Sequence, residues 1–408
     1  MRLNDERVLR LREDFPALKR LLNGRPLAYF DGPGGTQVPQ SVIGAVSGYY
    51  ATCNANAHGQ FITAQDSDRI LQETREALAS FLGAPSWKEI SVGANMTSLA
   101  FALSRALSRR IKPGDEVVIT QLDHEANRGP WLRLQEQGAV VQEIALRRDG
   151  TLDSADLARK IGPKTRLVAI GFASNALGTV NDLALARRLS REVGAWLVVD
   201  AVHAAPHFPM DAAALDPDFL LCSVYKFYGP HVGVLYSRPG LLDSLDTDCL
   251  RTQDQASPFR IETGTQNHAA LAGTGAALHY LAGLGEGADL RSRLVDAMRS
   301  IRDRERGLAQ AYFDQVRRIP GVTVWGPEFS DALRAPTVSI TVKGHTAEVV
   351  ARALGAQGVA VWDGHFYAAR AVEVLGIEGG LVRAGLSMYT TGEEVQRLLD
   401  GIAGIARS

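Results

Sequence analysis

Two apolar runs that end in reactive side chains decide how this chain is expected to fold: Trp196-Leu-Val-Val-Asp200-Ala-Val-His203 and Phe219-Leu-Leu-Cys-Ser223-Val-Tyr-Lys226. Each run has the length and the apolar, partly β-branched content of a buried strand. The first ends in a carboxylate with an imidazole three residues later, and the second ends in a hydroxyl with an amine three residues later. Ligands of α/β proteins bind at the carboxyl ends of strands. The four side chains are therefore predicted to meet in one crevice.

Similar apolar runs alternate with helical patterns on both sides of this stretch. Strands are predicted over 90–93, 116–120, 140–144, 167–171 and 233–236. Short apolar strands separated by helices indicate a mostly parallel sheet with helices on both faces. Three more strand patterns, over 322–325, 337–342 and 359–362, follow a long helical stretch from 265 to 311. They predict a smaller C-terminal α+β domain.

The predicted organisation has three parts, in keeping with a length greater than that of one typical domain. Residues 1–25 read as an amphipathic helix that packs with the small domain. Residues 26–280 form the large ligand-binding domain, and residues 281–408 form the small C-terminal domain.

The composition of the chain argues against several classes of binding partner. The 408 residues carry a formal net charge of −1, which argues against nucleic-acid or membrane-surface partners. The charged N-terminus lacks the apolar core of a signal peptide, and no apolar run is long enough to cross a bilayer, so a cytoplasmic protein is expected. Three cysteines, Cys53, Cys222 and Cys249, show no paired spacing, which makes disulfides and a zinc site improbable.

Other predicted strand ends also carry polar side chains. Gly93-Ala94-Asn95-Met96-Thr97 stands between a strand and a helix, where free N–H groups suit a phosphate. His124 and Asn175 follow two further strands, and the imidazole could stack on a planar ring. The whole set of strand-end groups, including an amine and a carboxylate, is the inventory that a pyridoxal phosphate site needs.

Taken in order, these segments resemble the fold-type I, class V aminotransferases, and most closely their cysteine desulfurase branch. The resemblance runs nearly end to end. It is carried by Tyr29-Phe-Asp31-Gly-Pro-Gly-Gly35-Thr36, Asn54-Ala-Asn56-Ala-His58, Thr120-Gln-Leu-Asp-His124-Glu-Ala-Asn127, Ser174-Asn175-x-x-Gly178, Asp200-Ala-Val-His203, Ser223-Val-Tyr-Lys226-x-Tyr-Gly229-Pro230, Glu262-Thr-Gly264-Thr265 and Val382-Arg383-Ala-Gly-Leu-Ser-Met-Tyr389.

The resemblance implies a fold-type I enzyme that holds pyridoxal 5′-phosphate covalently on Lys226. Asp200 would pair with the protonated pyridine nitrogen, and His124 would stack over the ring. His203 and Asn175 would lie near the phenolic oxygen. The remaining cofactor contacts, all to the phosphate, are assigned to Ala94, Asn95, Ser223, Tyr225 and Thr265, the last of them from the second subunit of a homodimer.

The resemblance also implies roles toward a small amino-acid substrate. Lys226 would act as the base at Cα after releasing the cofactor, and Arg383 would bind the α-carboxylate with its planar fork. Loops around Gly34, His58, Arg260 and Tyr367 are expected to set specificity.

The pattern breaks at one important place. Cysteine desulfurases need a thiolate on a loop of the small domain, and the matching segment here is Val361-Trp-Asp-Gly364-His365-Phe-Tyr367-Ala368. Tyr367 takes the place of the cysteine and cannot form a persulfide. The prediction is therefore β-elimination, a C–S lyase reaction on a cysteine-derived amino acid, with Tyr367 or His365 protonating the leaving group.

Several alternatives stay open. A desulfurase-like transferase, a class V aminotransferase and an amino-acid epimerase are rival reactions at the same site. A scaffold without catalysis is disfavoured because Lys226 and Asp200 are both present, and a Ser-His-Asp hydrolase is disfavoured because there is no G-x-S-x-G elbow.

Overall fold

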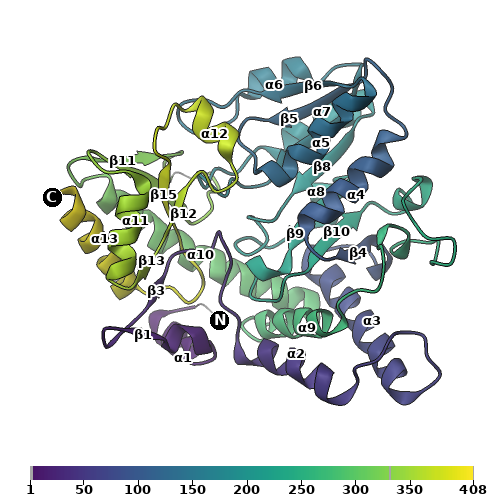
Figure 1. Ribbon diagram of the computed structural model, residues 1–408, viewed down its shortest axis with the longest axis horizontal. Coiled ribbons are helices and arrows are strands. Elements are labelled where there is room, and N and C mark those ends of the chain that lie inside the picture. Colours follow the sequence, from purple (N-terminus) through teal and green to yellow (C-terminus); the bar gives the residue numbers. More distant parts are fainter. Residues whose placement is uncertain (1–2, 330–331, 408) are drawn as a thin grey trace.

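The molecule consists of a large sheet with helices on both faces and a smaller antiparallel sheet domain beside it (Figure 1). The structure is a computed structural model that describes residues 3–329 and 332–407. The seven-stranded sheet has the order β4-β10-β9-β8-β7-β5-β6, with β10 antiparallel to both its neighbours and the other pairs parallel. Its strands are β4 (Ile90–Gly93), β5 (Glu116–Thr120), β6 (Val140–Ile144), β7 (Thr165–Gly171), β8 (Trp196–Asp200), β9 (Phe219–Ser223) and β10 (Gly233–Ser237).

This sheet is buried on both faces, which explains why its strands are continuously apolar. In β9, Phe219 and Leu221 join one hydrophobic cluster while Leu220 and Cys222 join the other. The cluster that contains Phe219 and Leu221 includes the apolar face of α4. The cluster that contains Leu220 and Cys222 includes residues of α3 and α7. The predicted class, a fold-type I α/β architecture with a smaller α+β domain, is confirmed.

The helices that surround the two sheets have the following bounds. They are α1 (Asp5–Arg12), α2 (Gln40–Thr52), α3 (Ile62–Leu82), α4 (Met96–Ser108), α5 (Gly129–Leu132), α6 (Ser154–Lys160), α7 (Leu183–Val193), α8 (Ala212–Leu215), α9 (His268–Ala282), α10 (Leu290–Val316), α11 (Ala347–Ala356), α12 (Ala369–Val374) and α13 (Gly392–Ala406).

A second, four-stranded sheet is formed by strands from the C-terminal part of the chain. Its order is β11-β12-β15-β14, all antiparallel, with β11 (Val322–Trp325), β12 (Thr337–Val342), β14 (Trp362–Gly364) and β15 (Leu381–Gly385). The N-terminal strand β3 (Ala28–Tyr29) pairs with β13 (Val359–Ala360) in a separate two-stranded sheet. A segment near the start of the chain is thereby joined to the C-terminal domain. β1 (Leu21–Leu22) and β2 (Arg25–Pro26) form a separate hairpin.

A glycine allows the loop after β3 to lie directly on β15. The Gly385 N–H donates to the Phe30 carbonyl at 2.7 Å, and a Cβ at Gly385 would lie 2.2 Å from Pro33 Cδ. Any larger residue at position 385 would push this loop away from the strand. The loop thereby reaches the carboxyl ends of the large sheet's strands.

The structure differs from the sequence-based expectations in four places. The helix predicted over 1–25 ends at Arg12, because Phe15 is extended before Pro16, a residue type that cannot donate a helical hydrogen bond. The helical stretch 265–311 is two helices, α9 and α10, separated at Gly283–Asp289. Helix α2 and strand β15 were not predicted. The division at 280/281 stays a prediction.

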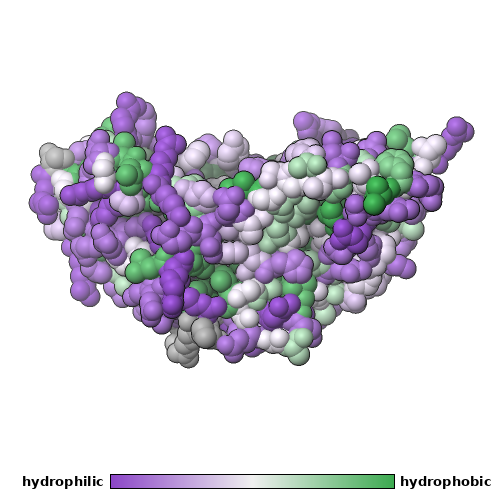
Figure 2. Space-filling model, turned by 90° about the horizontal axis from the view of Figure 1, so that it is seen from below, coloured by the Kyte–Doolittle hydropathy of each residue, from purple (hydrophilic) through white to green (hydrophobic). Residues whose placement is uncertain are grey.

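The surface differs between the two parts of the molecule. On the face seen in Figure 2, the side that carries the C-terminal domain is mostly hydrophilic, and the middle is paler. Large apolar side chains are exposed on α2 and at the start of α3, namely Ile43, Tyr50, Phe61 and Ile62. Within residues 3–329 and 332–407, no helix combines the length and the apolar character needed to cross a membrane.

Candidate active site

Two adjoining pockets lie at the carboxyl ends of the large sheet's parallel strands. The inner pocket is lined by strand-end residues, among them Asp200, His203, Ser223 and Lys226. The outer pocket shares His124, Asn175, Tyr225 and Lys226 with the inner one and adds Gly34, Phe101, Trp362, Phe366, Tyr367 and Arg383. As the sequence predicts, this amine, carboxylate, imidazole and hydroxyl all line one pocket.

Lys226 stands in the first turn after β9, and its side chain is almost completely buried. Its Nζ donates hydrogen bonds to the carbonyls of Pro33 and Gly34, the latter at 3.0 Å. Burial, and then the nearby Arg383 guanidinium, lower the pKa of this amine to about 7. An amine with that pKa is neutral and nucleophilic near physiological pH.

Asp200 ends β8 and offers a buried carboxylate to the inner pocket. Its Oδ1 accepts a hydrogen bond from the Val202 N–H at 2.9 Å. Burial raises its pKa to about 6. A buried acid without a paired cation is costly unless a positive group is supplied, so this position suits a protonated heterocyclic nitrogen.

His203 has one ring nitrogen satisfied and one unsatisfied. Its Nε2 lies 3.0 Å from Thr337 Oγ1, while its Nδ1 is buried with no partner among the described residues. Burial lowers the pKa of this imidazole well below its usual value. A neutral ring with an unused buried polar atom fits a site that takes a polar ligand, and pyridoxal phosphate is compatible with this set of donors and acceptors.

His124 and Tyr367 form a stack at the boundary between the pockets. Their ring centroids are 5.4 Å apart at an interplanar angle of 27°. His124 Nδ1 accepts a hydrogen bond from the Ala126 N–H, and burial lowers the pKa of the ring to about 4. The imidazole is therefore neutral at pH 7, which allows it to lie against a flat ring without a charge penalty.

Sequence reasoning gave no role to Asp123, which also lines the inner pocket. Asp123 is buried and accepts hydrogen bonds from the Gly171 N–H and from Asn127 Nδ2. Burial, and then the charge of Asp200, raise its pKa to about 7. The signal for Asp123 was present, because it directly precedes His124 after an apolar strand.

Arg383 lies in the middle of β15 with its side chain buried against the outer pocket. Its Nη2 is 2.9 Å from Asp31 Oδ1, its Nη1 donates to the Asn175 carbonyl, and its guanidinium lies over the Phe366 ring at 4.4 Å. Asp31 was not predicted as a site residue. It holds the fork of Arg383 in place and neutralises it while no other carboxylate is bound.

The segment 362–370 is docked onto the large domain by hydrogen bonds to its backbone carbonyls. The Glu125 N–H donates to the Tyr367 carbonyl at 2.7 Å, and Asn175 Nδ2 donates to the Phe366 carbonyl at 2.8 Å. Both Phe366 and Tyr367 have positive φ angles, 54° and 58°, which are unfavourable for residues other than glycine. Such a conformation persists only where the surroundings impose it.

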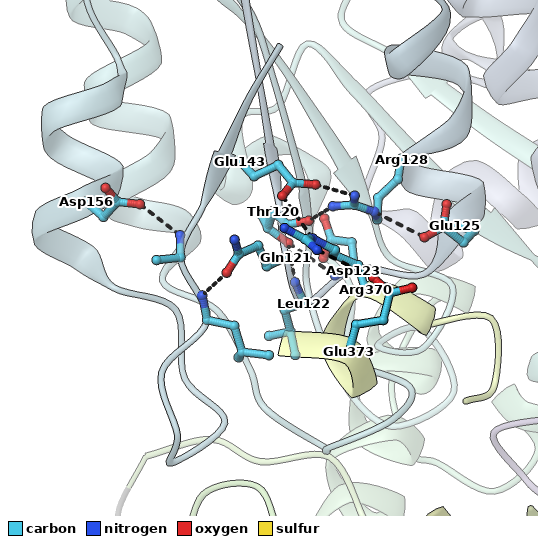
Figure 3. Close-up of polar contacts among 12 residues, drawn as sticks. Thr120, Gln121, Leu122, Asp123, Glu125, Arg128, Glu143, Asp156, Arg370 and Glu373 are labelled. Carbon is cyan, nitrogen blue, oxygen red and sulfur yellow. Dashed lines mark hydrogen bonds and ion pairs between the residues drawn. The ribbon is translucent and has the colours of Figure 1, made fainter. Parts of the chain in front are cut away.

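Ion pairs of Arg370, the last residue of this segment, also attach it to the large domain (Figure 3). Arg370, at the start of α12, pairs with Glu143 of β6 at 3.0 Å and with Glu373 of its own helix. Glu143 also accepts from Arg128, which is buried and pairs with Glu125. The chain of ion pairs connects the C-terminal domain to the edge of the large sheet, close to the outer pocket.

The other residues proposed from the sequence lie outside these two pockets. Ala94 and Thr265 line a third pocket together with His231, whose ring stacks on Tyr225 at 4.5 Å. Asn95 caps α4 by accepting the Ser98 N–H.

Two predicted histidines also lie apart from the pocket walls. His58 is exposed and pairs with Asp68 at 3.3 Å. His365 Nδ1 accepts from the Tyr367 N–H, beside the outer pocket but not among its lining residues. Their catalytic and substrate-binding roles stay predictions.

All three cysteines fall within the described part of the chain, and none of them lines the inner or the outer pocket. Cys222 is buried inside β9, and Cys53 is buried beside Tyr49. Cys249 is half-buried, and its Sγ donates to Gln255 Oε1. On the segment 362–368, the outer pocket is lined by Trp362, Phe366 and Tyr367.

Comparison with known proteins gives consistent matches over the whole chain. The model of the family "Aminotransferase class-V" matches residues 28–398. A cysteine desulfurase of Pectobacterium atrosepticum is 33% identical over 416 residues, which cover 98% of each chain. The structure of the cysteine desulfurase CsdA from Escherichia coli superposes with a TM-score of 0.85 at 28% identity and covers 98% of both chains. An apo cysteine desulfurase from Thermococcus onnurineus gives a TM-score of 0.87 at 27% identity, covering 100% of this chain and 99% of the other.

Proposed function

This chain belongs to the class-V aminotransferase family, and from that premise we propose that it cleaves the C–S bond of cysteine or of an S-substituted cysteine. It is a pyridoxal phosphate-dependent, cysteine desulfurase-like enzyme. The single observation that carries the proposal is the position of Lys226, a buried amine with a pKa of about 7, between Asp200 of the inner pocket and Arg383 of the outer pocket.

The residues of the inner pocket would hold the cofactor. Asp200 would pair with its ring nitrogen, His124 would cover one face, and Ser223 and Tyr225 would bind its phosphate beside Thr97 at the start of α4. Pyridoxal phosphate, when bound, supplies an electron sink for negative charge at the substrate's Cα.

The protein's own groups would bind and deprotonate the substrate. Arg383 would turn from Asp31 to the α-carboxylate, or hold both, because its fork has more donors than the one ion pair uses. Lys226, released from the cofactor, would take the proton from Cα. Because His124 is neutral, it would not compete for the carboxylate.

The fate of the sulfur distinguishes two reactions. The named activity of the similar proteins favours the desulfurase-like transferase over β-elimination. The absence of a cysteine from the walls of the described pockets favours elimination, in which the C–S electron pair leaves with the sulfur. Overall, elimination consumes one water per substrate and gives a thiol, pyruvate and ammonium. In that reaction Tyr367 or His365 would protonate the leaving sulfur.

The test is product analysis with the holoenzyme, L-cysteine and S-methyl-L-cysteine. Pyruvate with ammonium supports elimination, and alanine with transferred sulfur supports the transferase, so that either outcome confirms C–S cleavage. A racemised amino acid, or a keto acid that retains its sulfur, would instead identify an epimerase or an aminotransferase and reject the proposal. A protein that binds no cofactor would revive the scaffold hypothesis.

The Tyr367→Cys variant sharpens the same experiment. A thiol at this position would lie on the pocket wall against His124, where a desulfurase is expected to need one. We expect alanine formation to rise at least several-fold in this variant and not in Tyr367→Ser. The homodimer, with Thr265 completing the neighbour's phosphate site, and a cytoplasmic location belong to the proposal as well.

A further inference from the structure

The outer pocket has an aromatic wall that the chemistry at Cα does not require. Besides Tyr225 and His124, which it shares with the inner pocket, it is lined by the aromatic side chains of Phe101, Trp362, Phe366 and Tyr367. Trp362 and Tyr367 remain 54% and 68% exposed, respectively. Large aromatic side chains left open to water at the mouth of a pocket are characteristic of a surface that binds an apolar ligand group.

The strand register places Trp362 beside the group that would bind the substrate carboxylate. Trp362 of β14 is the direct partner of Arg383 in β15. Directly opposed residues of an antiparallel pair project their side chains from the same face of the sheet. A ligand anchored on Arg383 therefore has the indole as its neighbour.

Two anchors leave one direction for the substrate's side chain. Arg383 would hold the α-carboxylate, and Lys226 would stand at Cα on the inner side. The His124–Tyr367 stack and the segment 31–35 bound the space between them. The group attached at Cβ would extend into the outer pocket, which Trp362 and Phe101 line.

The charged groups that line the outer pocket are paired within the protein or are assigned to the Cα and carboxylate end of the substrate. Glu125 pairs with Arg128, and Arg383 pairs with Asp31. The volume of the pocket is about 590 Å³, which is far more than a free thiol needs. A bulky, uncharged substituent suits this wall better than a charged one.

We propose that the outer pocket is a subsite for an apolar or aromatic substituent on the sulfur of the substrate. The substrate class is S-alkyl and S-aryl conjugates of L-cysteine, with Trp362 as the main specificity-determining residue. This inference rests on the proposed function, because it assumes that a cysteine-derived amino acid is bound through Arg383 and Lys226.

The experiment is a spectroscopic titration of the holoenzyme with S-methyl-, S-propyl- and S-benzyl-L-cysteine and with the charged S-carboxymethyl-L-cysteine. The change in cofactor absorption gives each dissociation constant, and the rate of pyruvate or alanine formation gives kcat/KM. We expect S-benzyl-L-cysteine to bind at least about 10-fold more tightly than S-methyl-L-cysteine, since it buries an additional ring. The carboxymethyl compound should bind most weakly.

Variants assign this preference to the aromatic wall. Trp362→Ala should reduce the benzyl-to-methyl ratio about 10-fold, and Trp362→Phe should restore most of it. Val349→Ala, which truncates an exposed apolar side chain on α11 of the same domain, should leave the ratio unchanged.

The two proposals fail in different ways. Equal or weaker binding of the benzyl compound by the unaltered holoenzyme, with normal turnover of L-cysteine, would overturn the subsite alone. A Trp362→Ala variant with the original ratio would remove Trp362 from its role and overturn the assignment. No spectral change and no turnover with any compound would overturn the proposed function as well.

Discussion

The inner wall of the site, made of the strand-end residues of the inner pocket, and the outer wall, made of the segment 362–370, differ in burial and in the interactions that hold them. Inner-wall groups such as Asp200 and Lys226 are buried, lie at the end of a sheet strand or in the turn after it, and have strongly shifted pKa values. The outer wall is more exposed at Trp362, His365 and Tyr367, contains two non-glycine residues with positive φ and is held by a few hydrogen bonds and partly exposed ion pairs. We infer that the inner wall supplies the chemistry common to the family, while the outer wall selects the substrate.

The largest expected effect tests the inner wall at its centre. Lys226→Ala removes both the attachment point of the cofactor and the base at Cα, so turnover should fall at least about 1,000-fold. The absorption band of the lysine-bound cofactor should disappear, as measured on the purified variant. Lys112→Ala, an exposed lysine remote from the pockets, is the control that should keep both. An unchanged spectrum in Lys226→Ala would remove the lysine from its assigned role.

Arg383 tests the boundary between the two walls. Arg383→Ala should weaken binding of the amino acid about 100-fold while changing cofactor affinity little, because a charged pair with the substrate carboxylate is lost. Arg383→Lys should recover only part of this, since a lysine lacks the planar fork. The two affinities are measured separately, by titration of the holoenzyme and of the apoprotein. Equal losses in both would indicate that Arg383 is structural.

The pH dependence of cofactor attachment should distinguish a buried amine from an exposed one. The pKa of Lys226 is lowered to about 7, and only the neutral amine attacks the aldehyde. The rate of attachment to the apoprotein should therefore rise with pH through about 7 and then level off, as followed by stopped-flow absorption. An ordinary lysine would give a rate that keeps rising toward pH 10. A rate still rising steeply above pH 9 would contradict the burial argument.

The smallest effect is expected at the rim of the outer wall. Arg370→Ala removes an ion pair with Glu143 that is about one-third exposed, so the free energy of unfolding should fall by less than about 1 kcal/mol. Amide exchange at Tyr367 and Ala368 should nevertheless quicken, because the segment loses an anchor to the large domain. Arg352→Ala, which removes an exposed pair within α11, provides the matched control. Unchanged exchange would show that the backbone hydrogen bonds alone hold the segment.

Much of the inner wall could be predicted from the sequence because burial on both faces makes parallel strands continuously apolar and easily recognised. The strands that end at Asp200 and Ser223 were predicted within one residue of their observed bounds, and their polar ends meet in one pocket. The same reasoning overlooked Asp123, which has the same signal but was hidden by the histidine beside it.

The amino-acid order alone therefore indicates the fold class, the family and the set of polar groups that gather in the inner pocket, because each depends on local periodicity or on a contiguous motif. Only the tertiary structure decides how Asp31 meets Arg383 across 352 positions, how Trp362 comes to lie opposite that arginine, and how Tyr367 is stacked on His124. The first and the last of these contacts join segments that are far apart in the sequence, and the second depends on the register of two antiparallel strands. No local pattern encodes them, because their energy comes from groups that become neighbours only when both domains are folded.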